Sequence, residues 1–450
     1  MFRCALRATR ARCLRPLPTR AFRPPRIVRF STDVQKPSTT QPEPTNLRFT
    51  VDAEGNQMID LTFASEGLGL PAAAGYGWVQ LQFGDKVGKD HRYTIVRKLG
   101  WGTYSSTWLA RDSIENTFVA VKVLTGHMTD WCEHAIAWEP DAFRLISQTP
   151  RSPHCPPLLD EFIFPGEGSA GSHICFVMPL YGGDVRMLYR ERTTALPFPL
   201  AKRILLHLLC GIAHAYERGV VHTDIKPANI LFSTTMTTED IEAWMVEEPS
   251  RRHEPEASHD GIVQSAVSQP LPMITEDEAM RATYLLGDFG SAQPSELHND
   301  NTVIPVLLRP PEIYLGAKWD LPADIWTFGC LVFELVTAEH LFVHERNQKF
   351  DLDETENMLY QMMLYSREDF SGAQLQASPK APEYFNADCT LKKNPKLFGG
   401  SIQTRFDEMK IISDEDATET RLMERCLCLD PSSRSTATEL LSDPWFDGVE

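Results

Sequence analysis

Long hydrophobic runs are missing from this chain of 450 residues. No stretch reaches eighteen apolar residues, and the richest one, around 325–336, is interrupted by Thr327 and Glu334. Because a transmembrane helix needs about 20 mostly apolar residues, we expect no membrane span. Wholesale disorder is excluded too, since 42% of the residues are hydrophobic and 23% are charged. The length suits two or three packing units.

Paired cysteines are missing as well. The ten cysteines include no CxxC pair, and only Cys426 and Cys428 lie close together in the sequence. Zinc modules need closely spaced cysteines and disulfide scaffolds need a high density of them, so ten scattered cysteines indicate reduced thiols in a core. No internal repeat is visible.

Acidic residues are absent before Asp33, whereas the first 32 positions hold nine arginines mixed with Leu, Ala, Phe and Ser. This composition is typical of a mitochondrial transit peptide. We therefore expect residues 1–30 to direct the chain to the mitochondrion, with processing near Arg29. A disordered basic tail, or a reading frame begun too far upstream, is the alternative.

The net charge is −17, and it becomes −26 once the nine arginines are removed. Such a surface repels nucleic acid and anionic membranes and attracts basic partners. We therefore expect basic protein partners, no nucleic acid and no membrane. Solubility alone is the plain alternative explanation of the acidity.

The chain divides by composition and pattern into a linker, expected over 31–82, and a folded domain over 83–447. β-rich runs predict antiparallel strands in the first part, about 90–180, at 93–99, 106–111, 117–124 and 173–178. Helical spacing of apolar residues predicts one helix near 132–147. In the second part, about 181–447, it predicts helices at 201–219, 321–338, 354–365, 417–428 and 436–442. The predicted class is α+β, with a small antiparallel β-rich lobe before a larger helical lobe.

An acidic insert of 51 residues, 233–283, separates two apolar strands at 230–232 and 284–286. It holds 11 acidic residues against three arginines, together with four prolines. A loop of this length is usually functional or disordered. Thr238 is expected to cap a short helix through Trp244, and the rest of the insert is expected to be solvated.

Two glycines, Gly100 and Gly102, lie between two predicted strands. They let a hairpin close over phosphate groups with exposed backbone N–H groups, and the small Ser105 in the place of a third glycine permits close approach. An ordinary turn is the alternative. The hairpin residues considered for nucleotide binding are Leu99, Gly100, Trp101, Gly102, Thr103, Tyr104, Ser105 and Thr107.

Lys122 is a lone cation in an otherwise apolar strand, two residues after Ala120. A lysine that points inward requires a partner, because burying an unpaired charge is expensive. A nucleotide phosphate together with a helix carboxylate would satisfy it. A lysine whose ammonium group reaches the surface is the alternative.

The segment 221–231 is more specific, because Asp224, Lys226 and Asn229 lie on one loop that leads into a strand. The Asp224 carboxylate can accept a proton from an attacking hydroxyl group, and Lys226 can neutralise charge on a transferring phosphoryl group. Asp288 follows an apolar strand in the sequence Asp-Phe-Gly, where a carboxylate can chelate Mg²⁺ between phosphates. The order of these motifs indicates phosphoryl transfer.

This set of motifs resembles the protein-kinase signature over roughly residues 90–447. Glu312 in Pro-Pro-Glu, the run Asp324–Gly329, and Arg434 after Leu-Asp-Pro are similar to segments of the kinase large lobe. The sequences GWG, HTDIKP and LPADIW, and an insert that splits the domain, are similar to the serine/arginine-protein kinases.

The resemblance implies a two-lobed protein-kinase-like fold with ATP and Mg²⁺ as cofactors. Asp224 would be the catalytic base and Lys226 its phosphate-stabilising partner. Lys122 would bind the α- and β-phosphates, and Asn229 and Asp288 would bind Mg²⁺. The remaining implied ATP contacts are Ala120, Glu139, Met178 as gatekeeper beside the adenine, and the hinge residues Pro179 and Tyr181.

Three departures from the family pattern stand out. Thr223 replaces the arginine that pairs with a phosphate on the activation segment, which predicts activity without phosphorylation there. Pro305 occupies a position where kinases place a Ser or Thr that touches the catalytic Asp. The carboxylate that pairs with Lys122 is expected to be Glu139, although the following proline disfavours helical geometry there. Glu133 and Asp141 are the alternatives.

The sequence therefore predicts a monomeric serine/threonine protein kinase that uses ATP and acts on basic, Arg/Ser-rich proteins. A pseudokinase scaffold that binds nucleotide or partners without phosphotransfer is the alternative. Substrates of the serine/arginine-protein kinase type would imply the nucleus or cytoplasm, in conflict with the mitochondrial location that the arginine-rich start predicts.

Overall fold

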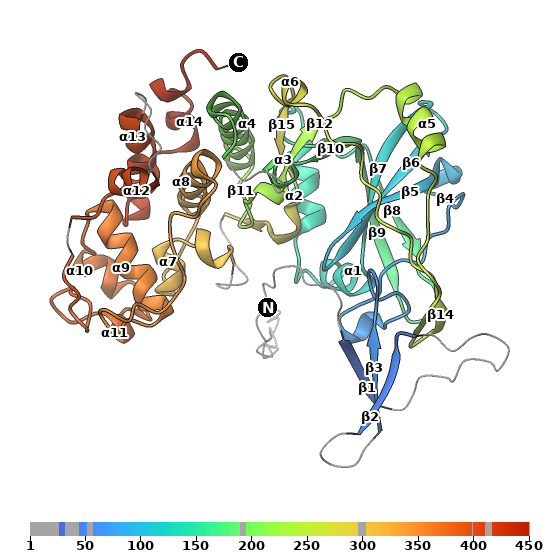
Figure 1. Ribbon diagram of the computed structural model, residues 1–450, viewed down its shortest axis with the longest axis horizontal. Helices are drawn as coiled ribbons and strands as arrows, with labels where there is room; N and C mark the ends of the chain where they lie inside the picture. The colour runs from blue at the N-terminus through green and yellow to red at the C-terminus, as the bar shows by residue number, and fades with distance from the viewer. Residues whose placement is uncertain are drawn as a thin grey trace, which may run out of the picture.

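The computed structural model describes residues 27–31, 45–51, 57–189, 195–295, 303–397, 399–409 and 416–449. Figure 1 shows two lobes, a sheet-rich one on the right and a helical one on the left. The α+β class and the order of the lobes predicted from the sequence are confirmed. The basic segment predicted over 1–30 lies outside the described residues, except where strand β1 begins at Ile27.

The small lobe is built on an antiparallel sheet with strand order β4-β5-β6-β7-β9-β8. Alternate residues of β7, among them Val119, Val121 and Val123, are buried in one apolar cluster, as expected of a strand with one face on a core. The four strands predicted here are confirmed. The strands are β4 (Lys86–Val87), β5 (Tyr93–Trp101), β6 (Ser105–Asp112), β7 (Thr117–Leu124), β8 (Asp160–Pro165) and β9 (Ser172–Pro179).

The helical stretch predicted near 132–147 is confirmed over α2, but the chain forms two helices in this region rather than one. Helix α1 (Gly126–Glu133) begins early, since the Thr125 hydroxyl accepts a hydrogen bond from the Met128 N–H group at 3.2 Å. Helix α2 (Glu139–Ile146) has Pro140 in its first turn, where proline needs no helical hydrogen-bond partner. The chain between them takes a positive φ of 54° at Ala135, which ends the first helix.

The large lobe is helical, and its buried apolar residues form one continuous cluster around α4 and α8. The helices predicted near 201, 321, 354, 417 and 436 are confirmed, with shifts of a few residues at their ends. The helices are α3 (Val185–Tyr189), α4 (Phe198–Tyr216), α7 (Pro311–Tyr314), α8 (Pro322–Thr337), α9 (Glu354–Ser366), α10 (Gly372–Gln376), α11 (Ala381–Tyr384), α12 (Ile402–Met409), α13 (Asp416–Cys426) and α14 (Ala437–Leu440).

Short strands line the junction of the lobes. One small sheet has the order β10-β12-β15 and another pairs β11 with β16. These strands carry the loops on which the predicted catalytic residues lie. Their bounds are β10 (Tyr181–Asp184), β11 (Val220–Val221), β12 (Ile230–Ser233), β15 (Tyr284–Leu286) and β16 (Gln293–Pro294).

Helix α4 is the one helix of the described residues that is long and apolar enough to cross a membrane by length and composition. In this protein 61% of its most apolar stretch is buried. It packs against α8, α14 and β15, so it forms the centre of the large lobe.

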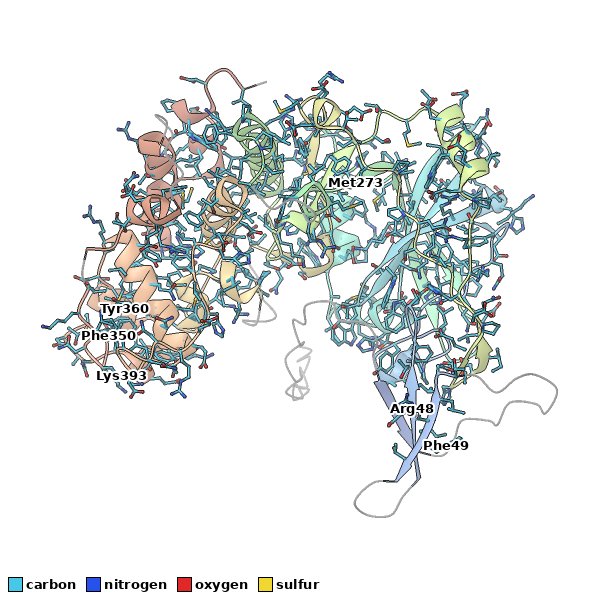
Figure 2. The ribbon with its side chains drawn as sticks, in the orientation of Figure 1. Arg48, Phe49, Met273, Phe350, Tyr360 and Lys393 are labelled. Carbon is cyan, nitrogen blue, oxygen red and sulfur yellow. The ribbon has the colours of Figure 1, made fainter. Side chains whose placement is uncertain are left out.

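The linker predicted over 31–82 is wrong for residues 47–51 and 57–82. Strands β1 (Ile27–Ser31), β2 (Leu47–Val51) and β3 (Gln57–Thr62) form an antiparallel sheet in the order β1-β3-β2. Residues from Ile59 to Leu81 then bury large side chains, including that of Trp78. Figure 2 shows Arg48 and Phe49 at the outer end of this sheet, where Phe49 is 58% exposed. The strands are only five or six residues long, which is why no lasting period appears in the sequence.

The expectation that most of the insert is solvated is also wrong. Helix α5 (Thr238–Glu247), strands β13 (Glu256–Ser258) and β14 (Gly261–Val263), and helix α6 (Glu276–Ala279) are ordered elements. The side chain that caps α5 is that of Thr237, one residue before the predicted Thr238. In Figure 1, α5 lies beside β6, and β14 lies near the N-terminal strands. Ala257 exchanges two hydrogen bonds, each of 3.0 Å, with the Asn46 side chain.

Candidate active site

A glycine hairpin joins β5 to β6 at the edge of the junction between the lobes. The Gly102 N–H group donates to the Ser105 carbonyl oxygen at 2.8 Å and closes the turn. A Cβ atom added at Gly100 or Gly102 would meet no other atom within 4 Å, so open space lies in front of the backbone. The hairpin can therefore admit a ligand close to its main chain.

A cavity of about 360 Å³ lies between this hairpin and the large lobe. It brings together most of the nucleotide and metal residues predicted from the sequence. Those that line it are Leu99, Gly100, Trp101, Gly102, Ser105, Thr107, Ala120, Lys122, Glu139, Met178, Tyr181, Asn229 and Asp288.

Several predicted residues do not line the cavity. They are Thr103 and Tyr104 of the hairpin, Pro179 of the hinge, and Asp224 and Lys226 of the loop that precedes β12. The Tyr104 ring lies instead beside Trp131 of α1, with ring centroids 6.2 Å apart. The aromatic ring of this hairpin residue therefore supports α1 rather than facing the cavity.

Lys122 projects from β7 into the cavity and forms ion pairs with two carboxylates. One is Glu139, the first residue of α2, and the other is Asp288 at 2.7 Å. Of the three acids considered for this position, Glu139 is the one in contact, whereas Asp141 pairs with Arg144 at 2.9 Å. Because Glu139 begins the helix, the proline after it causes no distortion.

The charges around Lys122 stabilise one another. Burial lowers the pKa of Lys122, but attraction to Asp288 and Glu139 outweighs burial and raises the pKa above its usual value. Burial likewise raises the pKa of Asp288, yet the neighbouring ammonium group of Lys122 outweighs it and holds that pKa at about 2. Both groups are therefore ionised at neutral pH.

The loop before β12 holds the predicted catalytic residues in one hydrogen-bonded group. The Asp224 carboxylate accepts hydrogen bonds from the Lys226 ammonium group at 2.6 Å and from the Asn229 amide at 2.9 Å. Asp324 of α8 accepts the backbone N–H groups of His222 and Thr223 at 2.7 and 3.0 Å. The loop is thus fixed to the core helix of the large lobe.

Thr223 has a left-handed backbone with φ of 62°, which is unusual for a β-branched residue. Its hydroxyl group donates to the Ser291 carbonyl oxygen at 2.7 Å, just after the Asp-Phe-Gly segment. This hydrogen bond links the loop of Asp224 directly to the segment of Asp288, with no phosphate between them.

The large lobe contains a buried ion pair between Arg434 and Glu312. Arg434 donates to both carboxylate oxygens of Glu312 at 2.7 and 2.8 Å, and its guanidinium group lies over the Trp326 ring. Both side chains are buried. This bidentate arrangement fixes α7, to which Glu312 belongs, to the segment that follows α13.

Sequence reasoning missed about half of the cavity lining. Two of the missed residues, Pro270 and Leu271, belong to the insert that was expected to be solvated. The apolar run between Pro270 and Ile274 is a signal that could have identified them. The other missed residues are Phe143, Pro156, Gly182, Gly183, Asp184, Met187, Ala228, Leu231 and Phe289, whereas Leu180 lies within the predicted hinge 179–181.

Comparison with known proteins agrees with this geometry. A family profile described as "Protein kinase domain" matches residues 93–243 and 273–446. The chain belongs to the protein kinase family. Members of this family use ATP and Mg²⁺. The unmatched residues 244–272 lie inside the insert. The match begins at residue 93, so it leaves out residues 57–82, called the N-terminal segment below, which contain Trp78.

Several curated relatives are similar over most of the kinase chain. The serine/threonine-protein kinase SRPK of Physarum polycephalum is 28% identical over 397 residues, covering 81% of this chain and 88% of its own. Protein kinase dsk1 of Schizosaccharomyces pombe is 24% identical and covers 80% and 81% of the two chains. The serine/threonine-protein kinase AFC3 of Arabidopsis thaliana is 26% identical and covers 79% and 82%. The predicted resemblance to the serine/arginine-protein kinase branch is confirmed.

Proposed function

We propose that this protein kinase transfers the γ-phosphate of ATP to Ser or Thr hydroxyl groups of basic, Arg/Ser-rich proteins. The observation that carries the proposal is the ion-paired group of Lys122, Glu139 and Asp288 in the cavity, next to the catalytic loop. It links a strand of the small lobe, helix α2 and the Asp-Phe-Gly segment in the arrangement that phosphoryl transfer requires.

The cavity suits ATP in size and in chemistry. Leu99, Ala120, Met178 and Leu231 supply an apolar region for the adenine, and the hairpin and Lys122 face the position of the phosphates. Mg²⁺ is usually bound by one or two carboxylates, by other oxygen ligands and by substrate phosphates, which fits Asp288 and the Asn229 amide. When bound, the metal ion would neutralise charge on the phosphates.

Asp224 is proposed as the base that orients the substrate hydroxyl group and accepts its proton. The ammonium group of Lys226, 2.6 Å from that carboxylate, is placed to offset charge on the phosphoryl group during transfer. Asn229 holds the Asp224 carboxylate in position through its amide. The chain has all four polar residues that an active kinase uses, namely Lys122, Asp224, Asn229 and Asp288. Their presence favours the enzyme over a pseudokinase scaffold.

The basic substrate class is supported by properties of the whole chain and not by a particular contact in the site. It consists of the net charge of −17 and the similarity to kinases named SRPK. The Thr223 bond to Ser291 supports activity without phosphorylation of the activation segment, because it joins the two catalytic segments directly. We also propose that the chain acts as a monomer.

The experiment uses protein without residues 1–26, incubated with ATP, Mg²⁺ and two peptide pools, one rich in Arg-Ser pairs and one not. Asp224→Ala is the control, and it is expected to lower transfer by about 10²- to 10⁴-fold. Transfer by the parent alone, with preference for the Arg-Ser pool, would support the enzyme and its substrate class. Equal use of both pools would reject the substrate class. Binding of ATP without transfer would favour the scaffold.

We propose further that residues 1–30 direct the protein to the mitochondrion, on the basis of their nine arginines and lack of acids. A fusion of residues 1–30 to a fluorescent protein, with all nine arginines changed to Gln as the control, tests this. Mitochondrial accumulation of the first fusion alone is the expected result. Cytoplasmic or nuclear fluorescence of both would reject the proposal.

A further inference from the structure

We propose that Trp78, which lies outside the part of the chain matched by the kinase family, is a positioning residue for phosphate binding by the glycine hairpin. The proposal rests on the proposed binding of ATP in the same cavity. It assigns a task in nucleotide binding to the N-terminal segment that the sequence pattern had marked as a linker.

Trp78 contacts the hairpin through its indole ring. The indole N–H group donates a hydrogen bond of 3.3 Å to the carbonyl oxygen of Gly102. The ring also meets Trp101 edge-on, with centroids 6.1 Å apart and an angle of 85° between the planes. Trp78 is only 3% exposed, so its side of both contacts is shielded from water.

The hydrogen bond fixes the orientation of one peptide group. The Gly102 carbonyl and the Thr103 N–H group belong to the same planar trans peptide, in which C=O and N–H point in opposite directions. Trp101 and Gly102 line the cavity, whereas Trp78 does not. The indole therefore lies outside the cavity lining. Because it holds the Gly102 carbonyl toward itself, the Thr103 N–H points the opposite way, although Thr103 is not itself a lining residue.

Trp78 is itself held in place from several directions. Its ring packs in an apolar cluster with Leu68 and with Val263 of the insert. The preceding residue, Gly77, accepts a hydrogen bond of 2.7 Å from the N–H group of Gly126, the first residue of α1. Gly77 has φ of 88°, and a Cβ atom there would lie 2.4 Å from the Ala170 carbonyl oxygen, so only glycine fits.

This anchoring matters because the glycines of the hairpin are open on the side where a ligand would bind. Open space lies in front of Gly100 and Gly102, and glycine backbones lose much conformational freedom when they are ordered. The Trp78 indole N–H, which α1 and the insert hold in place, orders the peptide between Gly102 and Thr103 before the ligand binds. This order lowers the entropic cost of binding. The benefit applies to ligands that carry phosphates and not to the nucleoside alone.

Trp78→Phe tests the proposal, since it removes the N–H donor and retains an aromatic ring. Trp445→Phe is the matched control, because the Trp445 side chain is equally buried and its indole N–H has no hydrogen-bond partner among the described residues. Dissociation constants of ATP, ADP and adenosine are measured by calorimetry on each protein. We expect Trp78→Phe to weaken ATP and ADP about three- to tenfold, as for loss of one hydrogen bond, with adenosine unchanged.

Kinetics supply a second readout. The KM for ATP should rise by the same factor in Trp78→Phe, while kcat at saturating ATP stays near that of the parent. Equal weakening of adenosine and ATP would show a general structural role and overturn the proposal, as would no change in either. If the parent itself binds no ATP, the proposed function fails and the inference fails with it. If the parent binds ATP, the comparison of Trp78→Phe with the parent tests the role of Trp78 alone.

Discussion

The two lobes of this kinase achieve their stability differently. In the large lobe, buried apolar side chains form one continuous cluster around α4 and α8. In the described part of the small lobe they fall into several separate clusters, and most of these include residues of the N-terminal segment or of the insert. A thin sheet with few helices cannot bury both of its faces, so segments from elsewhere in the chain cover it.

A buried ion pair in each lobe shows the same contrast. Arg434 and Glu312 join two parts of the large lobe. Lys98 of β5 pairs instead with Glu66 of the N-terminal segment, and its ammonium group also donates to the Ala266 carbonyl of the insert at 3.3 Å. A single side chain of the kinase sheet thus joins both additional segments. The small lobe is therefore incomplete without them.

The largest effect that we predict comes from Lys98→Met. The substitution leaves the Glu66 carboxylate buried without its partner, and loss of one member of a buried pair costs about 3–5 kcal/mol. Chemical denaturation should show this loss in the transition of the small lobe. Because the two lobes have separate apolar cores, the unfolding transition of the large lobe should stay as in the parent.

The double variant Lys98→Met with Glu66→Leu is the control for this prediction. Replacing both charges with apolar side chains removes the unpaired carboxylate, so most of the lost stability should return. If the single variant costs less than about 1 kcal/mol, the N-terminal segment does not stabilise the small lobe, and the contrast between the lobes is lost.

The second prediction concerns the insert. Leu271 packs with Leu109 of β6, Phe118 of β7 and Trp244 of α5. Leu271→Ala should destabilise the small lobe by about 2–4 kcal/mol, as expected for a large-to-small change in a core. Val246→Ala is the matched control, because Val246 belongs to the same insert but is 80% exposed. Equal thermal shifts in the two variants would show that the insert contributes no core.

The catalytic group was predictable because its residues stand at fixed short spacings on loops beside apolar strands. Asp224, Lys226 and Asn229 needed no tertiary information, and Lys122 was recognisable as one cation in an apolar strand. The two additional segments were not predictable in this way. Trp244 and Leu271 stand between acidic residues and prolines, and the strands that bury them lie more than a hundred residues earlier. The hydrophobic periodicity of a short window does not reveal contacts between residues so far apart in the sequence.

A third prediction uses the pH dependence of the insert. Burial raises the pKa of Glu256 on β13, and its Oε2 atom has no hydrogen-bond partner among the described residues. Below the pKa of the unfolded chain the carboxyl group is protonated in both states and has no effect. As the pH rises from there through the raised folded pKa, the folded protein loses stability. Glu256→Gln should therefore gain about 1 kcal/mol relative to the parent at pH 8 and nothing at pH 4. An equal difference at both pH values would contradict this account.

The smallest effect is predicted for the ion pair between Arg111 of β6 and Glu242 of α5, at 2.7 Å. Both side chains are partly exposed, so Glu242→Gln should cost only about 0.2–1 kcal/mol at low salt and nothing measurable in 1 M NaCl. Arg111 keeps its hydrogen bond to Asn116 and its place over the Phe118 ring in this variant. Thermal denaturation of parent and variant at the two salt concentrations measures the difference. A loss as large as that of Leu271→Ala would mean that charge rather than apolar burial holds the insert on the sheet, and the small lobe would then differ from the large lobe in the kind of force that stabilises it.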